Sequence, residues 1–279
     1  MLFGMFLLRL FLVACSLAGL ASAQNVRLYV FDAGVLQGLD PSGFHLTKAE
    51  VAETDMSCVS YLIVHPKGTL LWDSGVISDS DIEAGKGEQK GAAYTIKATK
   101  TLKSQLAAIG YAPKDITYFA LSHDHFDHVA NANAFAGSTW LVQQPERDAM
   151  FSDKPGPATV TAPFIALKNS KTQILHGGDY DVFGDGSVVI KAAYGHTPGH
   201  QVLYVKLQKS GPILLAGDLY HYNEERGTDK VPGFEFSREQ SLASRAAVEA
   251  FLKQSRAQLW IEHDLANFNK QKKSPAFYE

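Results

Sequence analysis

The sequence has few cysteines, little net charge and no repeats. Cys15 and Cys58 are its only cysteines, and 26 Lys and Arg nearly balance 29 Asp and Glu, for a formal charge of -3. Proteins that bind nucleic acids or anionic membranes usually carry a basic surface, so we expect neither partner. Since 46% of the 279 residues are hydrophobic and no low-complexity linker interrupts them, the composition excludes disorder and indicates one globular domain.

The first 24 residues differ from the rest, because they are apolar and carry one charge, at Arg9. They end in Ala21-Ser22-Ala23, a pattern typical of a secretory cleavage site. We therefore predict a signal peptide over residues 1–23 and a mature domain over residues 24–279, exported to the periplasm or secreted. Two alternatives stay open: a lipoprotein attachment box over Leu12–Cys15, and an uncleaved anchor.

Cleavage would leave Cys58 as the single cysteine of the mature chain. A lone thiol forms no internal disulfide, so the core or a metal must hold the fold. Cys58 lies in the apolar stretch SCVSYLIV, and we expect it to behave as a small buried hydrophobic residue.

Strand and helix patterns alternate along the chain, which predicts the α/β class. The pattern favours a polar loop over residues 77–95, a helix from Ile96 to Ile109 with Gly110 as its C-cap, and a long helix from about Arg238 to Ser255. Strands are expected at 26–34, 57–75 (a hairpin turning at Pro66–Gly68), 116–121, 138–143, 188–194, 201–207, 212–218 and 257–263.

Four of these strands end in His or Asp, at residues 121–128, 200, 218 and 263. Because α/β sites gather at strand ends, we expect these side chains to converge. The stretch HDHFDH (residues 123–128) is the strongest signal: His123 and His125 suit one metal ion, Asp127 and His128 a neighbouring one. Imidazole and carboxylate ligands suit divalent ions, with Zn²⁺ expected and Fe, Mn²⁺ or Co²⁺ as alternatives.

HDHFDH, GHTPGH (195–200), AGD (216–218) and EHD (262–264) resemble, in order, the motifs of the metallo-β-lactamase-fold hydrolases. The resemblance covers about residues 51–265. It implies an αβ/βα sandwich of two mixed sheets flanked by helices, with Asp73 supporting a dinuclear site. We expect His196, in the same turn as His200, to support the site or to form a structural hydrogen bond. The implied ligands are His123, His125 and His200 on one metal, Asp127, His128 and His263 on the other, and Asp218 bridging both.

The resemblance also implies hydrolysis of a small molecule by a metal-bridging hydroxide, with Asp127 or Asp218 steering the proton to the leaving group. GHTPGHQ and GDLYHYNE are similar to the N-acyl homoserine lactonase branch, in which a tyrosine three positions after the bridging aspartate polarises the lactone carbonyl. Here that position is His221, flanked by Tyr220 and Tyr222, and any of the three is a candidate for the role.

We therefore predict a lactone or carboxylic ester hydrolase. The alternatives are a phosphotriesterase-like or β-lactamase-like hydrolase of the same fold and, least favoured, a non-catalytic metal-binding protein. The loop 77–95 and the segment Asn223–Phe236 are the expected pocket walls. His45, His65 and His176 lie outside every motif and are given no role, and the sequence leaves the oligomeric state open.

Overall fold

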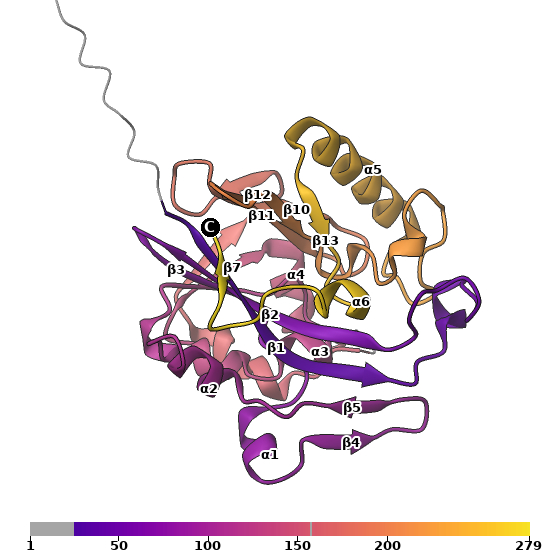
Figure 1. Cartoon of the computed structure of the whole chain (residues 1–279), viewed down its shortest axis with the longest axis horizontal. Coiled ribbons are helices and arrows are strands. Elements are labelled where there is room, and N and C mark those ends of the chain that lie inside the picture. The colour runs from indigo at the N-terminus through magenta and orange to yellow at the C-terminus, as the bar shows by residue number, and fades with distance from the viewer. Residues whose placement is uncertain (1–24, 157) are drawn as a thin grey trace, which may run out of the picture.

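The computed structural model describes residues 25–156 and 158–279, which form two mixed β-sheets packed face to face (Figure 1). The predicted signal peptide lies outside the described residues. The larger sheet has nine strands in the order β4-β5-β1-β2-β3-β6-β7-β8, with β14 also paired to β1. Its strands are β1 (Arg27–Gln37), β2 (Met56–His65), β3 (Gly68–Trp72), β4 (Glu88–Lys90), β5 (Thr95–Lys97), β6 (Tyr118–Ala120), β7 (Thr139–Gln143), β8 (Thr172–Leu175) and β14 (Phe277–Tyr278).

The smaller sheet has five strands in the order β13-β12-β11-β10-β9, and only its β12–β13 pair is parallel among the described residues. In the larger sheet, β3, β6, β7 and β8 run parallel to one another, so their carboxyl ends reach the same edge. The strands of the smaller sheet are β9 (Asp179–Asp181), β10 (Val188–Ala192), β11 (Gln201–Leu207), β12 (Gly211–Leu215) and β13 (Gln258–Trp260).

Side-chain alternation explains why β1 carries apolar residues on both of its faces. Leu28 and Val30 join the core between the sheets, whereas Tyr29 and Phe31 join the core beneath the helices. On the far side, α5 covers the smaller sheet through Val248 and Leu252 (Figure 1). The order helix–sheet–sheet–helix confirms the predicted αβ/βα sandwich. The α-helices are α1 (Asp79–Glu83), α2 (Leu102–Ala107), α3 (Phe126–Val129), α4 (Gln144–Met150), α5 (Arg238–Ser255) and α6 (Leu265–Phe268).

Two local predictions are wrong. The segment 77–95 is not one loop, since it contains α1, β4 and the start of β5. Ile96 opposes Leu36 within the β1–β5 pair, so it belongs to a strand, and α2 begins only at Leu102, after its N-cap Thr101. Pairing with β1 outweighs the weak helical periodicity of this stretch. Helix α5, in contrast, has the predicted bounds, with Ser237 as its N-cap.

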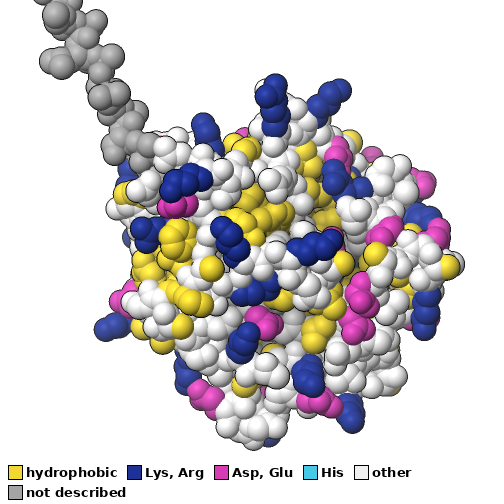
Figure 2. Space-filling model, viewed as in Figure 1, with side chains coloured by type: hydrophobic (Ala, Val, Ile, Leu, Met, Phe, Trp, Pro, Cys, Tyr) yellow, Lys and Arg dark blue, Asp and Glu magenta, His cyan; other side chains and the backbone are white. Residues whose placement is uncertain are grey.

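Lys, Arg, Asp and Glu are interspersed over the face shown in Figure 2. Among the described residues, no helix is long and apolar enough to cross a membrane. Cys58 is 0% exposed and packs with Met56 and Val76, as predicted. Its sulfur also lies within 4.8 Å of ligand atoms of Asp127 and His263, which places it directly beneath the histidine cluster.

Candidate metal centre

The histidine cluster begins where β6 ends, and the turn after β3 fixes its geometry. Asp73 adopts φ +57°, a conformation rare outside glycine, which marks a functional or strained position. Its Oδ1 accepts a hydrogen bond of 2.6 Å from the Ser122 N–H, and its Oδ2 lies 3.3 Å from Nδ1 of His128. The turn thus holds both the start and the end of the HDHFDH stretch, as the sequence predicts for Asp73.

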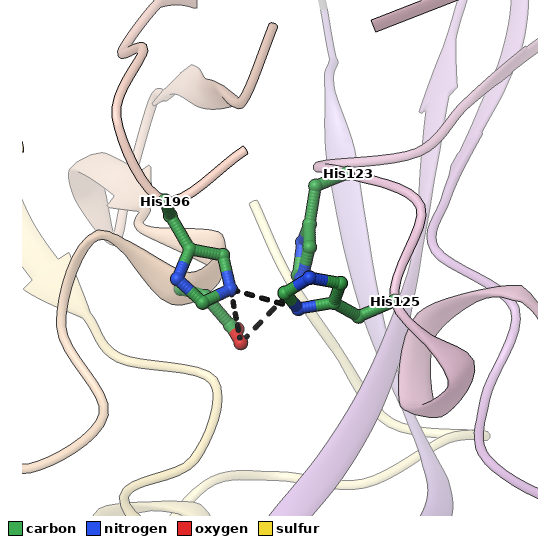
Figure 3. A group of neighbouring side chains, drawn as sticks. His123, His125 and His196 are labelled. Atoms are coloured by element: carbon green, nitrogen blue, oxygen red, sulfur yellow. Dashed lines mark hydrogen bonds and ion pairs between the residues drawn. The ribbon is translucent and has the colours of Figure 1, made fainter. Parts of the chain in front are cut away.

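One group of potential ligands consists of His123, His125, His196 and Asp218 (Figure 3). His196 Nε2 lies 3.0 Å from His125 Nδ1 and 3.4 Å from Asp218 Oδ2. Nε2 of His123 lies 3.5 Å from the same carboxylate oxygen. The four ligand atoms are within 4.8 Å of one another, close enough to share one ion.

The second group consists of His128, His263 and Asp218, with Asp127 beside them. Nε2 of His128 and Nε2 of His263 each lie 3.1 Å from Asp218 Oδ1. The Asp127 carboxylate lies 3.8 Å from His128 Nε2 and 3.6 Å from His263 Nε2. Asp218 therefore faces one group with each carboxylate oxygen, which is the arrangement expected of a bridging ligand.

The geometry reverses the predictions for His196 and His200. Nδ1 of His200 bonds the Ala193 carbonyl and its Nε2 accepts from the Asp218 N–H, both at 3.0 Å, so neither nitrogen faces the cluster. Burial, together with the nearby His196, lowers the pKa of His200 to about 3, which keeps the ring neutral. His200 is a structural residue behind Asp218, and His196 takes its place among the potential ligands.

The donor set fits divalent cations. His123 Nε2, His128 Nε2 and Asp218 Oδ1 are buried yet have no hydrogen-bond partner, a costly arrangement that a metal would relieve. Burial works against protonation of His196 and His263, but the pKa of His196 is raised to about 10 and that of His263 to about 9 by Asp218 and other carboxylates. The carboxylates thus favour positive charge at the place where an ion would bind.

The ligand histidines other than His125 are also held at the ring nitrogen that faces away from the cluster. Nδ1 of His263 lies 2.8 Å from the Ser57 carbonyl, and Nδ1 of His123 lies 3.0 Å from Ser122 Oγ. Glu262 was not among the predicted site residues, and its buried Oε1 lies 3.5 Å from Nδ1 of His128. A buried carboxylate directly before a ligand histidine is the signal that would have revealed it.

Glu146 of α4, which was also not predicted, fixes the GHTPGH turn. Its carboxylate accepts hydrogen bonds from Thr197 Oγ1, from the Gly199 N–H and from the Asp124 N–H, at 2.7 to 2.9 Å. Burial raises the pKa of Glu146, and the neighbouring Asp124 adds to the effect. One side chain thus ties the HDHFDH stretch to the turn that carries His196.

Of the three candidates after Asp218, only His221 reaches the cluster. His221 Nε2 lies 3.2 Å from Asp218 Oδ2, and its ring stacks on His263 with centroids 5.6 Å apart. The Tyr220 hydroxyl donates to Glu249, and the Tyr222 hydroxyl donates to the Thr54 carbonyl. Both tyrosines point away from the cluster, so the structure does not support their predicted catalytic role.

A cavity of about 360 Å³ opens onto the cluster and is mostly apolar. Ala93, Tyr94 and Phe234 come from the two predicted wall segments, which confirms that these segments contribute. The remaining walls were not predicted and include Leu36, Leu39, Phe44, Met56 and Phe126. A second cavity of about 520 Å³ lies on the other side of His125, Ala158 and Phe234, next to His196.

The three histidines without a predicted role stay outside the cluster. His45 and His176 are exposed. His65 is buried against Phe183, and its Nε2 lies 2.8 Å from Asp185.

A model of the metallo-β-lactamase superfamily matches residues 54–253, which include every potential ligand described above except His263. The chain belongs to this superfamily. The fold and the motifs HDHFDH, AGD and EHD agree with that membership, and the resemblance seen in the sequence is confirmed.

The relatives that match over nearly the whole chain are lactonases. The N-acyl homoserine lactonase AttM of Azorhizobium caulinodans is 28% identical over 91% of this chain and 99% of its own length. The N-acyl homoserine lactonase AiiA of Bacillus thuringiensis subsp. kurstaki is 27% identical over 86% of this chain and 93% of its own. A solved N-acyl homoserine lactone hydrolase with N-hexanoyl-L-homoserine at its catalytic metal centre superposes with a TM-score of 0.74, at 25% identity over 90% of this chain and 98% of that one.

Proposed function

We propose that the protein opens the ring of N-acyl homoserine lactones, or of closely related lactones, at a dinuclear centre of divalent ions, with zinc as the expected metal. The observation that carries this proposal is the pair of ligand groups that share Asp218 and open onto an apolar cavity. The names of the relatives support the lactone class. They do not favour the phosphotriester or β-lactam alternatives, and an open site with two ligand groups is unnecessary for a non-catalytic binder.

His123, His125 and His196 would hold one ion, and Asp127, His128 and His263 the other, with Asp218 between them. Two bound ions would supply a nucleophilic hydroxide at neutral pH and polarise the substrate carbonyl. Asp127 and Asp218 both line the cavity, and either would pass a proton to the leaving ring oxygen.

His221 is the residue placed to donate a hydrogen bond to the lactone carbonyl. It lines the cavity, and its Nε2 faces Asp218. Its Nδ1 lies 3.7 Å from the buried carboxylate of Glu225, which is itself paired with Arg245. The donor for this role is the N–H at Nε2, which faces Asp218 Oδ2, and stacking of the ring on His263 fixes its orientation. Such a donor would stabilise the charge that develops on the carbonyl oxygen.

The apolar walls would receive the acyl chain. Phe44, Met56, Tyr94 and Phe126 surround the cavity next to the ligands, and Tyr94 stacks on Phe126 with centroids 6.4 Å apart. Burial of each methylene of a chain contributes about 0.8 kcal/mol, so these walls favour acylated over simple lactones.

Initial rates of purified, zinc-loaded protein test the proposal. The panel contains C4 to C10 acyl homoserine lactones, a simple γ-lactone, a paraoxon-type triester and a cephalosporin, with ring opening followed by proton release. We expect acyl homoserine lactones to react fastest and chelator-treated protein to be inactive. Turnover of the cephalosporin or the triester alone would refute the lactonase proposal.

We further propose that the chain is exported and cleaved after Ala23. The support is the apolar leader and its Ala-Ser-Ala ending. Intact mass of the protein recovered from the periplasm or medium should correspond to a chain beginning at Gln24. A mass that includes the leader, or one that carries lipid on Cys15, would favour the anchor or the lipoprotein alternative.

A further inference from the structure

Residues 231–237, here called the strap, connect the cavities to the beginning of α5. The strap carries Phe234 and Phe236, which are 50% and 63% exposed, and between them Glu235, whose side chain is only 3% exposed. Aromatic rings outside and a carboxylate inside reverse the usual preference of these residues. Both the buried position of Glu235 and the exposed positions of Phe234 and Phe236 therefore need an explanation.

The inward carboxylate contacts a proposed metal ligand. Oε1 of Glu235 lies 3.0 Å from Nδ1 of His196, and its Oε2 accepts a hydrogen bond from the Ser241 hydroxyl. A carboxylate at Nδ1 keeps the proton on that nitrogen and leaves the Nε2 lone pair free for a metal. The strap backbone holds the same turn, since the N–H groups of Phe236 and Ser237 donate to the carbonyls of His196 and Gly195.

The other ligand histidines are supported differently. His128, His263 and His123 are held at their outer nitrogens by residues on β2 or directly after the strands of the larger sheet, which are part of the rigid core. Among these four, only His196 is held by a segment that lies outside the sheets and also forms a cavity wall.

The outward aromatic rings form that wall. Phe234 lines both cavities, and its ring lies edge-on to Phe44, His221 and His196 at centroid distances of 5.5, 5.9 and 6.0 Å. Phe236 lines the second cavity. A shift of the strap would therefore move the support of His196 and the aromatic wall together.

We propose that Glu235 is a positioning residue that orients His196 toward the metal and couples binding of that ion to the position of the strap. The strap carries this coupling to the cavity walls, because Phe234 lines both cavities and Phe236 lines the second. This inference rests on the proposed metal centre.

Metal affinity of Glu235 variants gives the first test. Zinc competition against a chromogenic chelator is measured for the wild type, Glu235→Ala, Glu235→Gln and the control Glu239→Gln. Removal of a carboxylate behind a ligand histidine typically lowers metal affinity about 10- to 100-fold, so we expect this loss in Glu235→Ala for one of the two ions. Glu235→Gln keeps an acceptor oxygen and should lose less. Glu239 is exposed on α5 and also carries one negative charge, so its variant should match the wild type.

Hydrogen exchange gives a readout that is independent of activity. Zinc should slow exchange of the Phe236 and Ser237 amides in the wild type and in Glu239→Gln, and should have little effect on them in Glu235→Ala. If Glu235→Ala does not fold, Ser241→Ala loosens the same carboxylate from its other end, and we expect it to give a partial loss of both affinity and protection.

The outcomes separate the two proposals. A wild type that binds no metal would overturn the proposed function together with this inference. A wild type that binds two ions, with Glu235→Ala or Ser241→Ala of unchanged affinity and unchanged strap protection, would overturn the role of Glu235 alone.

Discussion

The two histidines of the GHTPGH turn should respond in opposite ways to removal. His196→Ala deletes a side chain that faces the cluster, so the protein should bind one metal ion fewer and lose activity while its core stays intact. His200→Ala deletes a side chain that faces away, so both ions should remain while the fold is weakened. The sequence alone predicts the reverse, which makes this pair a direct test of the structure.

The size of the His200 effect follows from its contacts. The ring is 0% exposed and both nitrogens are hydrogen-bonded, to the Ala193 carbonyl and the Asp218 N–H. Each buried group left unpaired costs about 1–3 kcal/mol, so the loss is on the order of 2–6 kcal/mol. For a domain of this size, roughly 2–4 °C of melting temperature corresponds to 1 kcal/mol, so a decrease of about 10 °C is expected.

The assay measures metal and stability on the same samples. Metal content is determined by plasma mass spectrometry after zinc loading and desalting, and melting is followed by calorimetry. His45→Ala, at an exposed position outside the cluster, is the matched control and should change neither quantity. The reasoning would be refuted if His200→Ala lost an ion with little change in melting temperature while His196→Ala kept both.

Three further outcomes are expected. His221→Phe should lower kcat by about 10²- to 10³-fold, as loss of an oxyanion donor does, whereas Tyr222→Phe should stay near wild type; equal losses would argue against His221. Gly217→Ala should unfold more easily in urea, because φ is +49° and an added Cβ would lie 2.7 Å from Ser122; unchanged stability would contradict this packing. Folding lowers the pKa of His200 from 6.5 to about 3, so the unfolded chain binds a proton that the folded one does not. Chelator-treated protein should therefore lose stability as the pH falls from 6.5 toward 3, by up to about 1.4 kcal/mol per pH unit. His200→Ala should show no such dependence of stability on pH.

The sequence predicted the site correctly where neighbouring residues in the chain fix the geometry. HDHFDH follows directly on a buried strand, so its residues share one edge of the sheet whatever the rest of the chain does. Helix α5 was predictable from Arg238 to Ser255, because it follows the N-cap Ser237 and has an apolar face that covers a sheet.

The sequence did not predict the site where residues distant in the chain decide which way a side chain points. Glu146 lies about 50 positions before the GHTPGH turn and accepts hydrogen bonds from Thr197 and Gly199. These bonds determine which histidine of the turn faces the cluster. An added Cβ at Gly195 would lie 2.2 Å from the Ser241 backbone nitrogen, so α5 also shapes the turn. Neither contact can be read from the motif. Likewise, Tyr220 and Tyr222 turn away because Glu249 and the Thr54 carbonyl bind their hydroxyls.

The pairing of β14 with β1 has a consequence for how the chain folds. Leu28 and Tyr29 pair with Tyr278 and Phe277, so a strand near the amino end is completed by one near the carboxyl end. Until those last residues are available, this part of β1 presents unpaired backbone groups, which invite association with other chains. Contacts between such distant segments also form slowly. A truncation before Phe277 should therefore aggregate during refolding, although the metal ligands lie elsewhere.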